Sequence, residues 1–367
     1  MKILQELCSI PTAPFVESRV YGYVEAFARA RRKLKLSRDR FGNRLLVLPG
    51  QKKSPRIVFV AHTDHPGFVA RRMIDKQTLE ADFRGGVLRE YVDGSRVKFF
   101  DGYREIGGVV IGTSSDRERA NFPARATIRV KSAVSKNSPG MFDQGIGRFK
   151  GGRFLSRVCD DLAGAAAALT MLDQLHRKSS KPRATVAVLL TRAEEDGFIG
   201  ALAAAIEPKL LRRDDLMLSI ECSAAQPYAP QGKGVIIRVG DRISVFDSSL
   251  TFFLSQQAEA LAKRAKSFKF QRSLMPGGAC EGTVFDAYGF RTAAMCVPLG
   301  NYHNMDREKK KIGPEFIDVN DWQNMVKLFV AVAANAHQFD PKMRPLCTRL
   351  EKRFRRLRPL LLDHAGS

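Results

Sequence analysis

The sequence predicts an α/β protein in which helices flank a mostly parallel sheet and a small all-β domain is inserted into the chain. Apolar runs typical of buried parallel strands alternate with helix-forming segments in the first and last parts of the sequence. Between residues 70 and 152, short alternating runs separated by Gly, Asp and Asn replace this pattern, which is typical of a small antiparallel barrel or sandwich. At 367 residues the chain is long enough for both parts.

The first predicted elements lead to a strand that ends on polar residues. Apolar periodicity predicts a helix over residues 16–32, and a strand is expected over residues 43–48. Residues 57–61 form a run of β-branched and aromatic residues, which predicts a buried strand. This strand ends abruptly on HTDH, residues 62–65, before a Pro-Gly pair turns the chain.

The α/β pattern returns at Asp160. The segment AGAAAALTMLDQLH is a strong helix former, and residues 181–191 predict an apolar strand. Further strands are expected over 216–220, 235–239 and 293–297, and helices over 198–205, 251–264, 283–288 and 321–337. We therefore expect a discontinuous α/β domain (1–69 and 153–340), an inserted β domain (70–152) and a basic C-terminal extension (341–367) that is a peripheral helix or partly disordered.

Charge and cysteine content narrow the class of protein. The net charge of +23 is spread over the chain, with clusters at 29–35, 309–311 and 352–358 that are typical of solvated helix faces. No zinc-finger, RNP or P-loop pattern accompanies them, so nucleic acid is not an expected partner. Six cysteines without a CxxC pair indicate reduced, mostly buried thiols. The lack of a long apolar run or a secretory signal predicts a cytoplasmic protein that does not associate with membranes.

Polar side chains follow the predicted strands at the places where α/β proteins bind ligands. The candidates are His62 and Asp64 after the first apolar strand, Glu194 and Glu195 after the second, then Glu221 and His303, with Asp160 and Asp161 at the start of the Ala-rich helix. Ligand sites of open α/β sheets lie outside the carboxyl ends of the strands. We therefore expect these imidazoles and carboxylates to converge at one edge of the sheet.

Each of these residues also has an ordinary structural interpretation. Asp160 or Asp161 could cap the following helix, and the acids at 194–196 could offset a helix dipole. Glu221 could be a loop acid, and His62 a hydrogen-bonded structural histidine. The combination favours a functional site, because burying so many carboxylates together without a compensating cation is costly.

A pair of divalent metal ions would offset these charges. Histidine and carboxylate ligands suit zinc first, with manganese or cobalt as alternatives, and two ions about 3.5 Å apart can share a bridging carboxylate. Asp64, two residues beyond His62 in an extended chain, is placed to hold the His62 ring by its second nitrogen. The sequence therefore predicts a dinuclear metal site at this edge of the sheet.

Six motifs occur in order along the chain: AHTD (61–64), CDDLAG (159–164), AEEDGFIGA (193–201), IEC (220–222), PGGACEGT (276–283) and NYHN (301–304). Together they resemble the cocatalytic metallo-aminopeptidases of the glutamyl aminopeptidase, or tetrahedral aminopeptidase, family, from about residue 4 to residue 337. The resemblance implies that the inserted β domain is PDZ-like. It also implies that subunits assemble into a large homo-oligomer through that domain.

The resemblance further implies a role for each site residue. The implied metal ligands are His62, Asp160, Glu195, Glu221 and His303, with Asp160 bridging two ions, His62 and Glu221 completing one ion, and Glu195 and His303 the other. Glu194 would be the general base. This chain departs from the family at His65, where a Glu is usual, at Glu221, where an Asp is usual, and at CEGT (280–283), where TDAG is typical.

The activity implied by the resemblance is hydrolysis of the N-terminal peptide bond of peptides. Glu194 would take a proton from a water held between the ions and pass it to the leaving amine. A carboxypeptidase or amidohydrolase (deacylase) of the same superfamily is an alternative, since a Glu at position 221 is common in that branch. A non-catalytic basic binding protein on a peptidase scaffold is another. The basic surface could favour peptides with acidic side chains.

Overall fold

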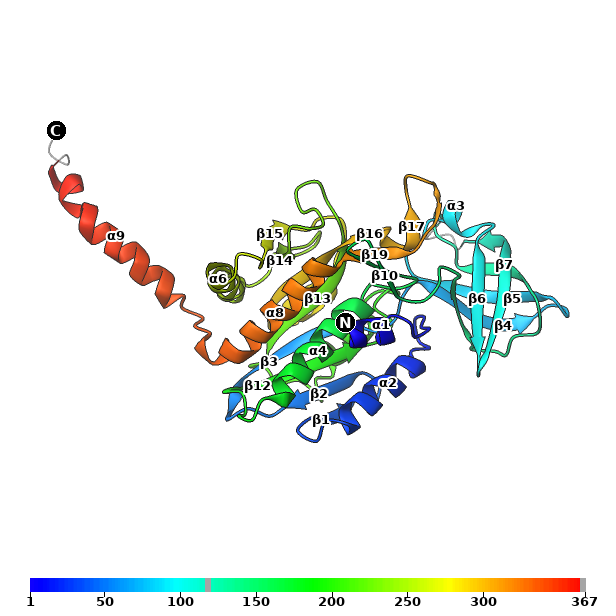
Figure 1. The fold of residues 1–367 in the computed structure, drawn as a ribbon, viewed down its shortest axis with the longest axis horizontal. Helices are drawn as coiled ribbons and strands as arrows, with labels where there is room; N and C mark the ends of the chain where they lie inside the picture. Colours follow the sequence, from blue (N-terminus) through cyan, green and yellow to red (C-terminus); the bar gives the residue numbers. More distant parts are fainter. Residues whose placement is uncertain (116–119, 364–367) are drawn as a thin grey trace.

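A large mixed sheet covered by helices and a separate closed barrel make up most of the fold (Figure 1). The computed structural model describes residues 1–115 and 120–363. The barrel is formed by a segment inserted between two parts of the chain that both contribute to the large sheet. The predicted α/β class with an inserted all-β part is therefore confirmed.

The large sheet has eleven strands and a parallel core. In order across the sheet the strands are β1 (Lys35–Arg38), β2 (Arg44–Leu48), β12 (Ala184–Thr191), β3 (Lys52–His62), β13 (Leu216–Ala224), β16 (Arg291–Gly300), β19 (Glu315–Asp318), β11 (Arg153–Ser156) and β10 (Arg148–Lys150), with β14 (Val235–Gly240) and β15 (Phe270–Leu274) branching from β16. The pairs β12–β3, β3–β13 and β13–β16 are parallel. The carboxyl ends of these four strands therefore meet at one edge of the sheet.

Helices cover both faces of this sheet. On one face lie α1 (Lys2–Leu7), α2 (Ser18–Arg29), α4 (Leu162–Arg177), α6 (Ser248–Arg264) and α8 (Val319–Asn335), and on the other α5 (Ile199–Ile206) and α7 (Glu281–Ala287). In β3, Ile57, Phe59 and Ala61 pack on the first face, whereas Val58 and Val60 pack on the second. Successive residues of a strand point to opposite faces, so a strand covered on both sides must be apolar throughout.

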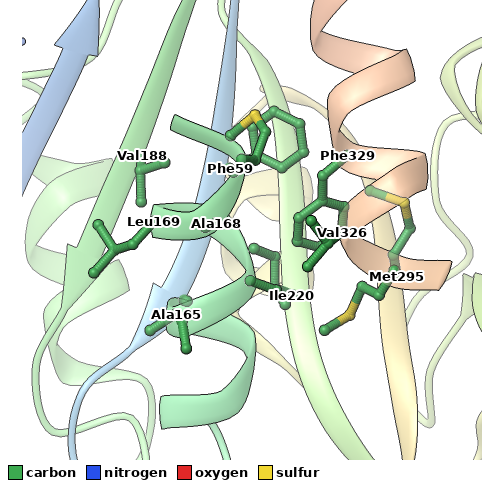
Figure 2. Close-up of a cluster of buried hydrophobic side chains, with 14 of the residues drawn as sticks. Phe59, Ala165, Ala168, Leu169, Val188, Ile220, Met295, Val326 and Phe329 are labelled. Atoms are coloured by element: carbon green, nitrogen blue, oxygen red, sulfur yellow. The ribbon is translucent and has the colours of Figure 1, made fainter. Parts of the chain in front are cut away.

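Helices α4 and α8 pack over the centre of the sheet (Figure 2). Ala165 and Ala168 are small, so the backbone of α4 comes close to the strands beneath it. Phe329 of α8 fills the neighbouring space, and its ring centroid lies 5.0 Å from that of Phe59 in β3. The Ala-rich composition of α4 therefore serves close packing as well as helix formation.

The inserted barrel closes in the order β4-β5-β8-β7-β6-β9 with antiparallel neighbours. Its strands are β4 (Gly67–Met73), β5 (Thr78–Arg84), β6 (Arg96–Asp101), β7 (Arg104–Ser114), β8 (Arg125–Val130) and β9 (Pro139–Phe142), with the short helix α3 (Arg89–Val92) between β5 and β6. Phe68, Phe83, Phe99 and Phe142 fill its core. Only residues 63–66 separate β4 from β3, so the barrel is joined directly to the edge where the parallel strands end.

The predicted helices and strands occur with shifted ends. The helix expected over residues 16–32 is Ser18–Arg29, and the strand expected over 57–61 begins earlier, at Lys52. Short elements were not predicted, since they contain too few residues to show a period: α1, β1, β15, β19, the hairpin β17 (Met305–Asp306) and β18 (Lys311–Ile312), and the 3-10 helices η1 (Tyr302–Asn304) and η2 (Ala336–Gln338).

The C-terminal extension forms a helix that leaves the body of the molecule (Figure 1). This helix, α9, spans Arg344–Asp363. Among the described residues, no helix is both long enough and apolar enough to span a bilayer. All six cysteines are free thiols, and only Cys347, on α9, is exposed, which confirms the predicted reduced and mostly buried thiols.

Replacing Phe329 with Ala tests the packing of α8 on the sheet. Because the ring is fully buried, Phe329→Ala should lower the free energy of unfolding by about 3–5 kcal/mol. Phe354→Ala on α9 is the matched control, since Phe354 is 55% exposed, and should change it by less than about 0.5 kcal/mol. Urea denaturation followed by circular dichroism measures both changes. Equal losses of stability in the two variants would contradict the role of Phe329 in packing α8 on the sheet.

Candidate metal centre

The parallel strands bring the predicted polar side chains together at one edge of the sheet. β3 ends at His62, β12 leads into Glu194 and Glu195, β13 carries Glu221, β16 leads into His303, and Asp160 precedes α4. All six belong to groups whose oxygen and nitrogen atoms could hold a metal ion. β13 runs on to Ala224, so Glu221 lies within a strand and is not the loop acid of the structural interpretation.

The predicted ligands form two groups that share Asp160. One group contains His62, Asp160 and Glu221, and the other contains Asp160, Glu195 and His303; within each, one atom per residue lies within 4.8 Å of the others. His62 Nε2 is 3.7 Å from Asp160 Oδ1, whereas His303 Nε2 is 3.7 Å from Asp160 Oδ2. The two oxygens of one carboxylate therefore face different groups.

Asp64 fixes the position of His62 and of the following acids. The Nδ1 atom of His62 lies 3.2 Å from the backbone carbonyl oxygen of Asp64 and 3.6 Å from its carboxylate, so the closer contact is through the backbone. The Asp64 carboxylate accepts hydrogen bonds from the backbone amides of Glu194 (3.0 Å) and Glu195 (3.1 Å). Burial alone lowers the pKa of His62, but the carboxylates of Glu194, Asp160 and Asp64 raise it well above its usual value.

His303 is held by a residue of the inserted domain. Its Nδ1 lies 2.8 Å from the carbonyl oxygen of Gly86, between β5 and α3. Because a carbonyl only accepts, Nδ1 carries the hydrogen and Nε2 faces Glu195 at 3.2 Å. The ring of Tyr302 stacks on the imidazole at a centroid distance of 3.7 Å. Burial lowers the pKa of His303, but Glu195 and Asp160 raise it to about 9.

Glu315 connects two parts of the site through the backbone. One of its carboxylate oxygens accepts hydrogen bonds from the amides of Cys159 (2.6 Å) and Asp160 (3.0 Å). The other accepts from the amide of His303 at 2.8 Å. A single carboxylate from β19 therefore fixes the relative position of Asp160 and His303, which are far apart in the sequence.

Glu194 lies beside the first ligand group. Its Oε2 is 3.8 Å from His62 Nε2. Burial raises the pKa of Glu194 well above its usual value; His62 opposes this shift, whereas Glu221 and Glu195 add to it. The carboxyl group thus sits where a proton can be held or released according to the charge around it.

Asp161 does not cap helix α4, although it occupies the N-cap position. Its side chain makes no capping hydrogen bond, and its Oδ1 accepts instead from the Cys222 thiol at 3.4 Å. Gly164 leaves the room for this carboxylate, because a Cβ atom at that position would lie 2.2 Å from Asp161 Oδ1. Asp160 and Cys222 form a further group with Asp161 that could hold a metal ion.

Several buried oxygens at this edge have no hydrogen-bond partner among residues 1–115 and 120–363. They are Asp160 Oδ1, Asp161 Oδ2, Glu195 Oε1, Glu221 Oε1 and both carboxylate oxygens of Glu281. Leaving such oxygens unpartnered in a buried place is costly. Two buried imidazoles beside these oxygens are a donor set that fits divalent cations.

Sequence reasoning missed the structural roles of three buried residues. His65 and the segment containing Glu281 were noted only as departures from the family, and Glu315 gave no signal beyond being an acid in a short strand. His65 Nδ1 lies 2.8 Å from the carbonyl oxygen of Asp160, and Nε2 lies 3.0 Å from Asn304 Oδ1. Burial raises the pKa of the Glu281 carboxyl group to about 7, and the nearby His62 partly opposes this shift.

A cavity of about 720 Å³ opens next to the first ligand group. Glu221, Arg238, Arg153, Arg307 and Lys309 are among the residues that line it. Arg238 is buried, donates to Ser223 Oγ at 3.1 Å, and its Nε has no partner among the residues described. The cavity has room for an amino-acid side chain and carries positive charge on its wall.

Gly164→Ala tests whether the position of Asp161 matters for cation binding. The added Cβ collides with the Asp161 carboxylate, so we expect at least a tenfold loss of metal affinity, about 1.4 kcal/mol or more. Gly22→Ala on α2 is the control, because nothing lies within 4 Å of its Cβ position. Isothermal titration with Zn²⁺ measures both, and equal affinity in the two variants would refute this role of Gly164.

The raised pKa of His303 predicts how the stabilisation of the fold by added Zn²⁺ depends on pH. In the metal-free protein His303 titrates at about 9, above the usual value of about 6.5, so its protonation stabilises the fold fully below about pH 6.5 and loses this effect as pH rises through about 9. Cation binding requires the neutral ring. The rise in unfolding temperature when Zn²⁺ is added to chelator-treated protein should therefore be larger at about pH 8 than at about pH 6. An increase in unfolding temperature that is the same at both pH values would contradict the predicted competition between the proton and the cation at His303.

Comparison with known proteins places this geometry in a family. The sequence profile of the M42 glutamyl aminopeptidases matches residues 42–328. An aminopeptidase from the archaeon Desulfurococcus kamchatkensis has a similar structure, with a TM-score of 0.75 and 21% identity over 91% of this chain and 94% of that one. A TET aminopeptidase from a marine sediment thaumarchaeote has a similar structure, with a TM-score of 0.76 and 18% identity over 91% of this chain and 96% of that one. The TET1 peptidase of Pyrococcus horikoshii has a TM-score of 0.73 and 21% identity over 90% of this chain and 98% of that one. That peptidase can assemble into a tetrahedron or a large octahedral shell.

These structural likenesses establish the fold, and the profile covers most of the chain, including the strands that carry the two groups of candidate ligands. The chain belongs to the M42 glutamyl aminopeptidase family.

Proposed function

We propose that this chain is a metal-dependent aminopeptidase that hydrolyses the N-terminal peptide bond of peptides. Asp160 carries the proposal, because its two carboxylate oxygens face two separate groups of buried ligand atoms. This arrangement fits a carboxylate that bridges two divalent cations. In the proposal His62 and Glu221 complete one metal site, and Glu195 and His303 complete the other.

Zinc is the cation that we propose first, with cobalt or manganese as alternatives, because imidazole and carboxylate ligands suit all three. When bound, the ions polarise the peptide carbonyl and acidify the attacking water. His303 is prepared for this role, since its Nδ1 hydrogen is donated to Gly86 and its Nε2 is left to coordinate. His62 contacts the Asp64 carbonyl with its Nδ1 in the same way.

Glu194 is proposed as the group that moves the proton. Its carboxylate would accept a proton from the attacking water and pass it to the leaving amine. Asp64 supports this role, because it accepts the backbone amides of both Glu194 and Glu195 and so fixes the segment. Glu195 faces His303 while Glu194 faces His62, so two adjacent acids can serve different purposes.

The cavity beside Glu221 is proposed to receive the side chain of the N-terminal residue. Arg153, Arg238 and Arg307 on its wall favour an acidic side chain. Two acids on the same wall, Asp306 and Glu308, weaken this field, and Asp306 is paired with Lys309 at 3.2 Å. We therefore expect a preference of moderate size.

The catalytic domain in this proposal comprises residues 1–69 and 153–340, with residues 70–152 as the inserted domain. The barrel strands themselves run from Gly67 to Phe142, and β10 (Arg148–Lys150) already pairs within the large sheet. Contact of Gly86 with His303 supports a role for the insertion in completing the site. We further propose that the chain forms a homo-oligomer, since related TET1 chains form a dodecamer in one crystal structure.

A carboxypeptidase or deacylase of the same superfamily is the second candidate, favoured by one observation. The ligand in β13 is Glu221, and a Glu at that position resembles that branch. Such an enzyme would act on N-blocked substrates, whereas an aminopeptidase requires a free N-terminal amine. Hydrolysis of N-acetylated peptides at the rate of free ones would favour the second candidate.

Glu194→Gln tests the proposed base. Glutamine keeps the shape of the side chain but cannot accept the proton, so kcat on an aminoacyl anilide should fall by about 10²–10⁴-fold with Zn²⁺ binding retained. Glu259→Gln, at an exposed position of α6, is the control and should leave kcat unchanged. Retained activity in Glu194→Gln with normal metal content would remove Glu194 as the base.

Comparing Glu and Gln anilides tests the charge preference of the cavity. The two side chains are nearly isosteric, so a difference in kcat/KM reports the charge alone. We expect the Glu substrate to be favoured by about tenfold at low salt, with the preference shrinking as ionic strength rises. Equal values for the two substrates would remove the acidic preference without affecting the assignment as a peptidase.

A further inference from the structure

Helix α9 stands apart from the machinery described above and has two contrasting faces. Every residue from Cys347 to Leu362 is exposed. Leu350, Phe354, Leu357 and Leu361 follow one another at intervals of four, three and four residues, which places them on one face of the helix. Leu350 and Phe354 are each 55% exposed and Leu361 is 64% exposed, so none of the described residues covers this stripe.

The remainder of α9 is strongly basic. It contains seven basic residues, Arg344, Arg349, Lys352, Arg353, Arg355, Arg356 and Arg358, against the two acids Glu351 and Asp363, a net charge of +5. Arg344 pairs with Asp340 at 2.7 Å, and Arg355 lies 3.7 Å from Glu351. The other basic side chains have no ion-pair partner in the described part of the chain.

A helix without tertiary contacts is only marginally stable in water, and most helices gain stability from a surface that covers the apolar face. The profile of the family ends at residue 328, so α9 also lies beyond the matched domain. Against the expectation from the sequence that the protein does not associate with membranes, we propose that α9 binds the surface of an anionic lipid bilayer, with its leucines and Phe354 in the interface and its arginines at the headgroups.

Charge selects this occupant over a second copy of the chain. Two α9 helices packed against each other would bring together two net charges of +5, which disfavours pairing of this helix with its own copy and favours an anionic surface. Nucleic acid would satisfy the arginines but would leave the apolar stripe in water.

The end of the helix selects a bilayer over an acidic groove in another protein. Leu360, Leu361 and Leu362 are consecutive, so they point in different directions around the helix, and they are 57%, 64% and 62% exposed. A groove on a protein covers a single stripe of a helix, whereas the membrane–water interface can surround the C-terminal end of α9, where the three leucines lie. This inference concerns no residue of the metal centre and does not depend on the proposed peptidase activity.

Co-sedimentation of the full-length protein with vesicles tests the proposal. Vesicles of mixed phosphatidylglycerol and phosphatidylcholine should bind the protein at least about tenfold more tightly than phosphatidylcholine alone, and about 0.5 M salt should weaken that binding. Joint replacement Leu350→Ser, Phe354→Ser and Leu361→Ser should reduce binding at least about tenfold with an unchanged unfolding temperature. The matched control replaces three exposed apolar residues of the body, Ile74→Ser, Ile206→Ser and Ile243→Ser, and should bind like the wild type.

Four results would overturn it. Equal binding to both kinds of vesicle would exclude an anionic bilayer surface as the partner of α9. A triple α9 variant that keeps vesicle binding shows that the apolar stripe is not the contact. If the wild-type protein does not bind vesicles, and the wild type and the triple variant bind single-stranded RNA equally well, α9 is a nucleic-acid-binding helix. If the triple variant forms a smaller assembly than the wild type by light scattering, α9 contacts a second copy of the chain.

Discussion

Repulsion among carboxylates buried at one edge of the sheet is the constraint on which the rest of the structure depends. Asp160, Asp161, Glu195 and Glu221 all come to this edge, and each keeps a buried oxygen without a partner among the described residues. Burying a charge costs several kcal/mol even after relaxation, unless an opposite charge meets it. Divalent cations between His62 and His303 would supply that charge, and the distances around Asp160 leave a place on either side of it.

A second set of buried carboxylates holds this arrangement in place without needing a cation. Glu315 accepts the amides of Cys159, Asp160 and His303, and Asp64 accepts those of Glu194 and Glu195. Their charges are satisfied by backbone hydrogens, which are numerous where strands end and helices begin. The acids of the site therefore divide into those that position the backbone and those that remain available for metal.

The sequence carried more information about the site than about its support. His62 and Glu194 could be predicted because apolar strands end next to them, and the edge of a parallel sheet is a known place for ligands. The contact between Glu315 and Asp160 joins residues 155 positions apart, and no local pattern indicates such a contact. The left-handed backbone of His303, with φ of 55°, is likewise set by its surroundings. Asp64 lies beside His62, yet its carboxylate contacts backbone amides that only the fold brings near.

The two-cation account is tested most directly by anomalous X-ray diffraction from crystals of the zinc-loaded protein, recorded at the zinc edge. The account predicts two peaks about 3.5 Å apart with the carboxylate of Asp160 between them, one next to His62 and one next to His303. A single peak away from Asp160, or none at any of these side chains, would contradict it.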